Sequence, residues 1–340
     1  MYYIILFISL LLLINFYFKI ADYFNIIDKP NNRSSHTEIT IRGGGIIFTI
    51  GAIAWFISSG FQFPWFFLGL LSITIVSFVD DIKPASRGIR IAVHFVAVLL
   101  LIYQLQSYNH ILQTFRPVGI FWLIVPVALI FVIGIINAYN FMDGINGITG
   151  GYSLAVLAGL WMANNDVIAF VENGFIYSLA IALMVFNVYN FRRKARCFAG
   201  DVGSVSIAFI LIFLLGKLIL TSGNIVYLFF LTLYGVDSVL TIIHRIYLKE
   251  NIFDAHRKHF YQVLANEGGV SQLKVATGYM VMQFLINGMI VGLIGRLSTV
   301  WMVLVILGLL IGLTGVYVFV QRRYAGRYNH VTRSGLDGIN

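Results

Sequence analysis

Long apolar stretches separated by short polar segments run along the whole chain. Such stretches have roughly the 17 to 25 residues that an α-helix needs to cross a bilayer, and no strand-like alternation of apolar and polar residues suggests a membrane β-barrel. We therefore expect an all-α polytopic membrane protein, one domain over residues 1–340. About eleven transmembrane helices are expected, at residues 2–18, 43–59, 63–79, 88–105, 119–136, 148–163, 174–190, 205–220, 224–243, 272–295 and 299–320.

The basic residues fall on alternate polar segments. If the N-terminus is outside, every Lys and Arg except Arg116, Lys217 and Arg296 lies on the cytoplasmic side. This distribution is the one that the positive-inside rule describes for short loops. An odd number of spans then places the C-terminus in the cytoplasm.

The composition agrees with a membrane protein. The chain is 59% hydrophobic and 11% charged, with a mean hydropathy of +0.87, whereas soluble domains are about 25% charged. The net charge of +9 then reflects topology and contact with anionic membrane lipids, and not nucleic acid. The single cysteine, Cys197, excludes an intrachain disulfide and a cysteine metal site. The polar segments are too short to fold as a separate soluble domain.

A polar stretch at residues 137–151, N-A-Y-N-F-M-D-G-I-N-G-I-T-G-G, lies at the mouth of an apolar span. Asn137, Asn140 and Asp143 recur every three residues, which places them close to one face of a helical end. Carboxylate and amide groups at membrane depth are costly to desolvate and are seldom retained without a function. We expect part of a functional site here; the alternative is a polar turn between two spans.

Acidic residues stand at two other span ends on the same predicted side. Asp80 and Asp81 close the third span, where two adjacent carboxylates repel each other unless a cation or a proton is present. Asp201 begins a helix between Gly200 and Gly203. Mg²⁺ typically binds one or two carboxylates together with substrate phosphates. The alternatives are a solvated helix end for the pair and an N-cap for Asp201.

Segment 25–45 is basic and ends in three glycines that open the second span. Free backbone N–H groups at a helix start attract anions, and Arg33, His36 and Arg42 could grip a phosphate. The alternative is a juxtamembrane loop that only sets the topology.

Loop 244–271 contains His256 and His259, three residues apart and so on one helical face. Zinc would need further ligands of the right kind, and the other clusters are rich in oxygen. Phosphate contact is therefore expected, and packing without function is the alternative.

Five segments follow in order on one predicted membrane face: R-S-S-H…R-G-G-G, V-D-D, N-A-Y-N-F-M-D-G-I-N-G, F-N-V-Y-N…G-D-V-G-S and H-R-K-H-F-Y-Q. Together they resemble the polyprenyl-phosphate N-acetylhexosamine-1-phosphate transferases, the WecA/MraY superfamily or glycosyltransferase 4 family. The resemblance covers nearly the whole chain. Its specificity comes from five motifs in order on a matching topology, because none of them is decisive alone.

The resemblance implies an enzyme that moves a sugar 1-phosphate from a UDP-N-acetyl sugar to undecaprenyl phosphate and releases UMP. It implies Mg²⁺ as cofactor, with Mn²⁺ as a substitute, and membrane lipids as surroundings. It also implies a multi-pass protein of the bacterial inner membrane with its active site on the cytoplasmic face. A homodimer is compatible with the sequence, although no stripe of small residues specifies one.

The resemblance also assigns roles to residues. Asp201 would hold Mg²⁺, while Asp80 and Asp81 would lie beside the metal and the lipid phosphate, and one of them, Asp80 by preference, would deprotonate that phosphate. The expected nucleotide contacts are Asn140, Asp143 and Asn187, and the expected diphosphate or sugar contacts are His256, Arg257 and His259. The remaining expected substrate contacts are Arg33, Ser35, His36, Arg42 and Asn137.

Two details refine this expectation. Asn146 stands where many members of the family carry a second aspartate, which lowers the charge near the nucleotide. The form H-R-x-H-x-Y-Q looks more like the enzymes that initiate O-antigen or capsule-type glycans than like the peptidoglycan enzyme. The alternatives are a phospho-MurNAc-pentapeptide transferase of peptidoglycan synthesis and, from another class, a non-catalytic lipid transporter.

Overall fold

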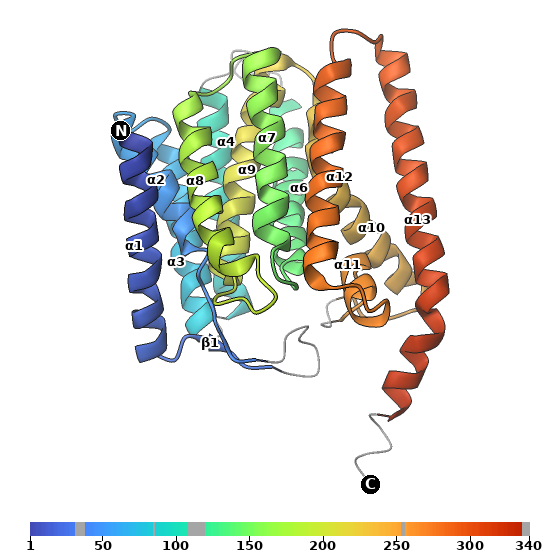
Figure 1. Ribbon diagram of the computed structural model, residues 1–340. Coiled ribbons are helices and arrows are strands. Elements are labelled where there is room, and N and C mark those ends of the chain that lie inside the picture. Colours follow the sequence, from blue (N-terminus) through green and yellow to red (C-terminus); the bar gives the residue numbers. More distant parts are fainter. Residues whose placement is uncertain (31–37, 84–85, 108–119, 253–255, 335–340) are drawn as a thin grey trace.

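The protein folds as a bundle of long helices (Figure 1). The structure is a computed structural model that describes residues 1–340 except 31–37, 84–85, 108–119, 253–255 and 335–340; the side chains of residues 120–123 and 325–334 are also outside the description. The described residues contain two short strands, β1 (Ile27–Asp28) and β2 (Thr40–Ile41), which pair in antiparallel orientation.

Each of the eleven expected spans coincides with a helix. Nine of the helices in the described residues are long and apolar enough to cross a membrane. Two of the expected spans are not among these nine: α2, which has only 13 residues, and α7. The expected all-α polytopic membrane protein is thus confirmed. The helices are α1 (Tyr2–Tyr23), α2 (Ile46–Ser58), α3 (Pro64–Ile82), α4 (Arg87–Ser107), α6 (Ile120–Met142), α7 (Ile148–Asp166), α8 (Asn173–Asn190), α9 (Gly200–Ser222), α10 (Thr232–Tyr247), α12 (Gln272–Leu293) and α13 (Thr299–Ser334).

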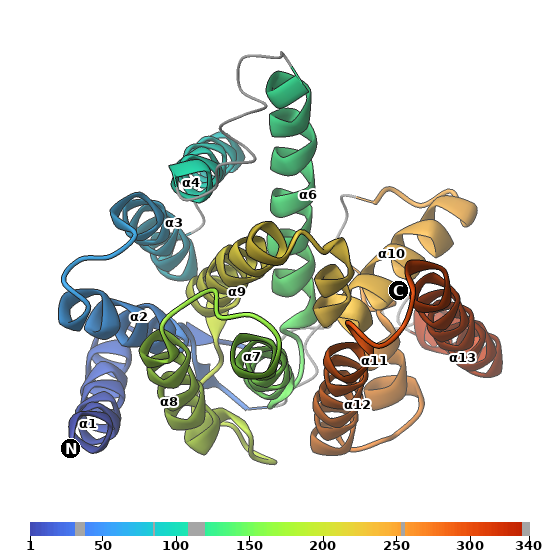
Figure 2. The same ribbon diagram turned by 90° about the horizontal axis from the view of Figure 1, so that it is seen from above.

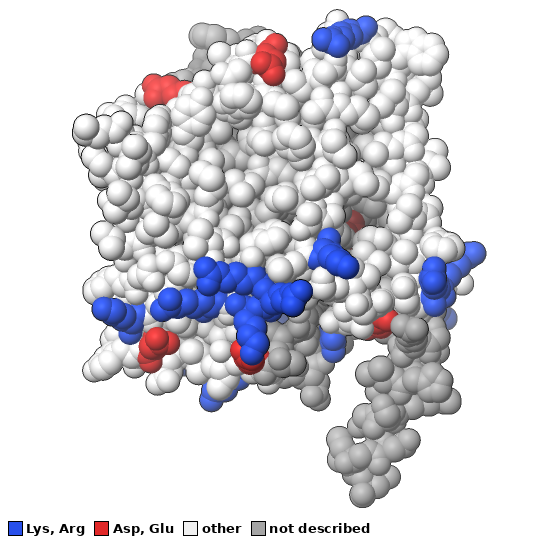
Figure 3. Space-filling model, viewed as in Figure 1, with Lys and Arg blue, Asp and Glu red and all other residues white. Residues whose placement is uncertain are grey.

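Successive helices run in opposite directions, so the start of α1 and the end of α13 lie at opposite ends of the bundle (Figure 1). One end carries β1, β2, the α8–α9 loop and the short helix α11 (Phe260–Gln262). Most of the exposed Lys and Arg side chains gather towards the same end (Figure 3), among them Arg192, Arg193, Lys194 and Arg196 of the α8–α9 loop. We call it the basic end of the bundle.

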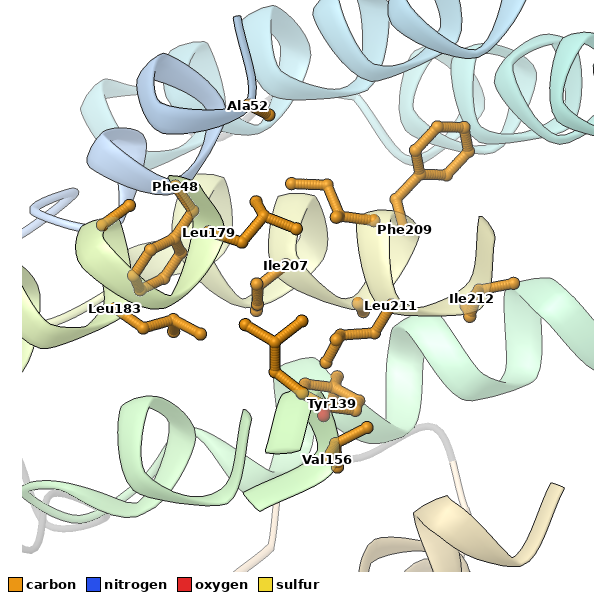
Figure 4. Close-up of a cluster of buried hydrophobic side chains, with 14 of the residues drawn as sticks. Phe48, Ala52, Tyr139, Val156, Leu179, Leu183, Ile207, Phe209, Leu211 and Ile212 are labelled. Carbon is orange, nitrogen blue, oxygen red and sulfur yellow. The ribbon is translucent and has the colours of Figure 1, made fainter. Parts of the chain in front are cut away.

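The helix at the centre of the bundle is α9 (Figure 2). A larger share of α9 is buried than of any other candidate span in the described chain. Its residues 207–215 are apolar on all sides, and such a helix must be surrounded by others. Ile207, Phe209 and Leu211 of α9 pack in one core with side chains from α2, α6, α7 and α8 (Figure 4). This packing fixes the position of the N-terminus of α9 at the basic end.

Helices α2 and α9 touch backbone to backbone at their N-terminal ends. A Cβ on Gly45 would lie 2.3 Å from Cα of Gly203, and a Cβ on Gly203 would lie 2.7 Å from Cα of Gly45. Backbone atoms cannot turn aside as a flexible side chain can. The two glycines therefore let the chain that precedes α2 lie directly on the start of α9.

We expect Gly45→Ala to lower the stability of the protein by about 3 kcal/mol, the upper range for overpacking a filled site. The measurement is thermal denaturation in detergent. Gly278→Ala is the matched control, because an alanine Cβ at this position of α12 meets nothing within 4 Å and a helical alanine is favoured over glycine by up to about 1 kcal/mol. Equal melting temperatures for the two variants would contradict the close backbone contact.

One span is interrupted within the bundle. The 3₁₀ segment η2 (Ile225–Leu231) precedes α10, and at the break Gln283 of α12 accepts a hydrogen bond from the backbone N–H of Leu233 at 3.0 Å and donates one to the carbonyl of Phe229 at 3.3 Å. In an apolar surrounding such backbone groups need internal partners. The break sets the course of α10, which runs to the basic end.

Candidate active site

Arg42 joins two of the carboxylates singled out from the sequence. Its Nε lies 2.7 Å from Oδ1 of Asp81, and one terminal guanidinium nitrogen lies 3.0 Å from Oδ1 of Asp201. The side chain of Asp81 is fully buried, whereas those of Arg42 and Asp201 are one-third and one-fifth exposed. A guanidinium group is well suited to this contact because its donors are fixed in one plane.

The backbone around Arg42 is held on three sides. Its N–H donates to the carbonyl of Ile26 at 3.0 Å, and its carbonyl accepts from the hydroxyl of Tyr17 in α1 at 2.6 Å. On the third side, the N–H of Phe198 donates to the carbonyl of Ile41 at 2.8 Å, and the N–H of Gly44 donates to the carbonyl of Phe198 at 2.9 Å. The segment before α2 is thus bonded to the α8–α9 loop, and this places Arg42 at the start of α9.

Asp81 binds the N-terminus of α9 from a neighbouring helix. Its Oδ1 accepts from the N–H of Asp201 at 2.9 Å and its Oδ2 accepts from the N–H of Val202 at 3.0 Å. The first N–H groups of a helix have no partner within the helix, and the positive end of its dipole favours a carboxylate. Together with Arg42, these bonds engage both oxygens of Asp81.

Asp80, the residue before Asp81, has different partners. Its Oδ2 lies 2.7 Å from a guanidinium nitrogen of Arg90, whose side chain is 40% exposed, and its carboxyl group lies close to that of Asp201. Two carboxylates this close repel each other, and Arg42 at Asp201 and Arg90 at Asp80 each offset part of that repulsion; a bound cation or a shared proton would offset more of it. Asp80 and Asp201 thus form a pair that can bind either one.

A second group of polar side chains continues from α6 into the α6–α7 loop. Asn140 accepts a hydrogen bond from the hydroxyl of Ser204 in α9 at 2.9 Å, and Asp143 accepts one from the hydroxyl of Thr149 at 2.6 Å. Burial raises the pKa of Asp143 to about 6, although the Thr149 bond opposes the shift. Asn137 is exposed on α6, so the three-residue register brings only Asn140 and Asp143 into these contacts.

Asn187 of α8 packs on the start of α7. A Cβ on Gly150 would lie 2.3 Å from Oδ1 of Asn187, so only glycine leaves room for the amide. Both amide atoms of Asn187 are buried, and neither has a hydrogen-bond partner in the described part of the protein. An amide with this environment is suited to bind a polar ligand, since leaving it unpaired costs free energy.

The uncharged side chain of Asn146 makes hydrogen bonds that hold two loops together. Its side-chain amide donates to the carbonyls of Arg192 and Arg193 at 2.9 and 3.2 Å, and its backbone N–H donates to Gln272 at 3.1 Å. Nearby, Asn190 accepts from the N–H of Gly147 and donates to the carbonyl of Cys197, both at 2.8 Å. An amide can donate to carbonyls as a carboxylate cannot, so Asn146 joins the α6–α7 and α8–α9 loops.

The histidine motif lies beside these loops. His259 is buried, and its Nδ1 lies 3.2 Å from Oδ1 of Asp237 in α10. His256 is half-buried with its ring 4.9 Å from that of His259, and Arg257 is half-buried as well. Tyr261 donates from its hydroxyl to the carbonyl of Phe141 at 2.9 Å. This bond connects the motif to the end of α6, next to Asp143.

Comparison with known proteins finds one matching family model and several relatives. Residues 63–219 match the model of glycosyl transferase family 4. Over 312 residues the chain is 25% identical to a probable undecaprenyl-phosphate N-acetylglucosaminyl 1-phosphate transferase of Bacillus subtilis, covering 86% of this chain and 84% of the relative. It is also 27% identical over 281 residues to the undecaprenyl-phosphate alpha-N-acetylglucosaminyl 1-phosphate transferase of Escherichia coli K12, covering 75% and 73%.

The family match and these relatives support assignment of the chain to the glycosyltransferase 4 superfamily. The matched region begins before α3 and ends within α9, so it contains Asp80, Asp81, Asn140, Asp143 and Asp201. The resemblance read from the motifs is confirmed at the level of the superfamily.

The donor atoms of the site fit the metal ion that the superfamily implies. In the described residues no three His, Cys, Asp and Glu side chains gather into a ready-made metal centre. Mg²⁺ does not require one, because it commonly takes one or two carboxylates and completes its shell with substrate phosphates and water. The adjacent carboxyl groups of Asp80 and Asp201 offer such a pair, whereas the oxygens of Asp81 are already engaged.

Not all of the residues predicted from the sequence are placed. Arg33, Ser35 and His36 lie outside the described residues. In the other direction, Arg90, Ser204 and Asp237 were not selected from the sequence, although they contact Asp80, Asn140 and His259. A charged residue within an apolar span was a signal for Asp237, but its partner comes from a loop more than twenty residues away.

The thiol of Cys197 is buried beside the site loops, and we expect it to have no chemical role. Cys197 is fully buried, and burial raises the pKa of its thiol to about 12. Because the thiolate is the reactive form, we expect a maleimide to label the denatured protein but not the folded one. We also expect Cys197→Ser to leave the catalytic rate unchanged. Rapid labelling of the folded protein, or a large loss of rate, would contradict this assignment.

Proposed function

We propose that this protein transfers an N-acetylhexosamine 1-phosphate from a UDP-sugar to undecaprenyl phosphate and releases UMP. The observation that carries the proposal is the contact of the Asp80 and Asp201 carboxyl groups beside Arg42 at the start of the central helix. This arrangement provides a cation site and a guanidinium group within one small region. Phosphoryl transfer depends mostly on positioning and on neutralising phosphate charge. The printed names of the relatives from Bacillus subtilis and Escherichia coli support the same reaction class.

In the proposed reaction, an oxygen of undecaprenyl phosphate attacks the sugar-linked phosphorus of the donor. The bond from that phosphorus to the bridging diphosphate oxygen breaks, and the two products are the undecaprenyl-diphosphate sugar and UMP. Asp80 would accept the proton if the lipid phosphate arrives protonated. Asp80 and Asp201 would hold Mg²⁺, which when bound neutralises phosphate charge.

The remaining residues bind and orient the substrates in this proposal. Asn140, Asp143 and Asn187 would hold the nucleotide, and His256, Arg257 and His259 would contact the diphosphate or sugar. Arg42 would take a phosphate oxygen when a divalent cation replaces it at Asp201. Asp81 has a different role from the one expected: it binds the N-terminus of α9 and so keeps Asp201 in place.

The proposed location is the bacterial inner membrane, with the basic end of the bundle and the site in the cytoplasm. The gathering of Lys and Arg at that end supports this orientation (Figure 3). The H-R-K-H-F-Y-Q motif favours initiation of an O-antigen or capsule-type polysaccharide as the pathway.

The test is UMP release by the purified protein with undecaprenyl phosphate and Mg²⁺, across a panel of UDP-N-acetyl sugars that includes UDP-MurNAc-pentapeptide. We expect release that depends on the lipid and is abolished by EDTA. The preferred donor identifies the sugar, and preference for the pentapeptide donor would indicate the peptidoglycan reaction. No release with any donor, from protein shown to be folded, would contradict the proposal.

A further inference from the structure

Asp237 is a buried carboxylate that the proposed roles above do not use. It lies in α10 with 2% of its surface exposed, and its partners outside α10 come from two other parts of the chain, residues 259–261 and α12. Its Oδ2 accepts from the hydroxyl of Tyr279 in α12 at 2.7 Å, while its two oxygens accept from the N–H groups of Phe260 and Tyr261 at 2.8 and 3.3 Å. Oδ1 also accepts from the hydroxyl of Thr241, one turn further along α10, at 3.2 Å, and it lies 3.2 Å from Nδ1 of His259. A buried carboxylate with this many donors is held in one orientation.

The two ring nitrogens of His259 differ in their contacts. Nδ1 faces Asp237, and because a carboxylate only accepts hydrogen bonds, Nδ1 carries the proton. Nε2 is also buried, and it has no hydrogen-bond partner in the described part of the chain. His259 is only 4% exposed. A buried ring nitrogen without a partner in a polar motif marks a group that is held for a ligand.

The neighbouring histidine differs in its environment. The Nδ1 of His256 accepts from the N–H of Lys258 at 3.3 Å, so this ring nitrogen carries no proton. Burial, followed by the charge of His259, lowers the pKa of His256 to about 4. Near neutral pH His256 is therefore uncharged. Among the described residues, the carboxylate contact in this motif is that of His259 with Asp237.

We propose that Asp237 is a positioning residue for the transfer reaction, which fixes the proton of His259 on Nδ1 and so presents Nε2 to a phosphate oxygen of the donor. A carboxylate at the far nitrogen orients an imidazole and stabilises its positive charge when Nε2 is protonated as well. Nε2–H then donates a charge-assisted hydrogen bond to the phosphate. This inference rests on the proposed function, because it takes the diphosphate of the UDP-sugar as the ligand of His259.

The competing explanation is purely structural. Asp237 also receives the first two N–H groups of α11, so it could serve only to hold that turn. The two explanations differ in one measurable respect. If Asp237 acts through His259, removing it costs nothing more once the imidazole is gone; if it holds the turn, the two losses add.

The experiment is a double-mutant cycle of Asp237→Asn and His259→Ala, with kcat and KM for the best UDP-sugar and the melting temperature measured for each protein. We expect each single variant to lose about 10²-fold in rate, the range for removing one group that stabilises developing charge, and the double variant to lose no more than His259→Ala alone.

Tyr279→Phe is the matched control. It removes a bond to Oδ2 of Asp237 but leaves the His259 contact, so its kcat should stay within about threefold of the unmutated protein, a change under 1 kcal/mol. Additive losses, or full activity of Asp237→Asn, would overturn the proposal.

A second measurement needs neither turnover nor a folded Asp237 variant. In the unmutated protein labelled with ¹⁵N-histidine, the resonances of His259 are assigned by their disappearance in His259→Ala. We expect a protonated Nδ1, and a neutral ring protonated only on Nε2 would overturn the inference. Absence of UMP release by the unmutated protein, in contrast, would count against the proposed function and leave this spectroscopic result intact.

Discussion

Asp201→Asn is expected to lower the rate of UMP release by about 10²- to 10³-fold, the range for losing one group that stabilises developing charge, and to leave the fold intact. The Asp201 side chain contacts Arg42 and Asp80, and the amide would remove the negative charge that a divalent cation requires. The position of the residue does not depend on that charge, because its backbone N–H is held by Asp81. The melting temperature should therefore change little.

Binding of Mn²⁺ by the variant, followed by electron paramagnetic resonance without substrate, separates metal affinity from turnover. We expect weaker binding than in the unmutated protein. Asp166→Asn is a suitable control, because Asp166 is exposed at the end of α7 away from the basic end. A near-normal rate with unchanged Mg²⁺ dependence would remove Asp201 from the metal site.

Asp81→Asn is expected to destabilise the protein by roughly 3 to 5 kcal/mol, the cost of removing one partner of a buried ion pair. An amide can accept through only one of its two polar atoms, whereas both oxygens of Asp81 accept from donors on Arg42 and α9. The NH₂ group would face a donor at one of these places. Activity should be lost together with stability.

Asp80→Asn is the matched comparison at the adjacent residue. Its ion-pair partner Arg90 is 40% exposed, and exposed pairs contribute about 0 to 1 kcal/mol. Removing a charge next to Asp201 also relieves repulsion. We therefore expect Asp80→Asn to lose activity while its melting temperature stays the same or rises. Equal melting temperatures for Asp80→Asn and Asp81→Asn would contradict the different roles given to the two carboxylates.

The sequence predicted the helices well but not their ends. The apolar run before Asn137 was expected to end at residue 136, yet α6 continues to Met142, and α9 begins at Gly200 and not at 205. Hydropathy marks the part of a helix that can lie in hydrocarbon. The additional turns are polar, and they carry Asn140 and Asp201 into the site.

The candidate site was predictable only in part. Clustering of the motifs at one end follows from topology, since an even number of spans separates them. The contacts within that end depend on the rotation and crossing of helices, which a pattern along one chain does not encode. For this reason the engagement of Asp81 by α9, the bond of Asn146 to the α8–α9 loop and the pairing of Asp237 with His259 were found only in the structure.

The contact of Arg42 with Asp81 and Asp201 has a consequence for assembly of the protein in the membrane. The guanidinium group supplies positive charge between these carboxylates from within the chain, so the bundle can close before any divalent ion arrives. We therefore expect folding not to require the proposed Mg²⁺. A protein made in magnesium-starved cells should accumulate in its folded form and become active when the ion is restored.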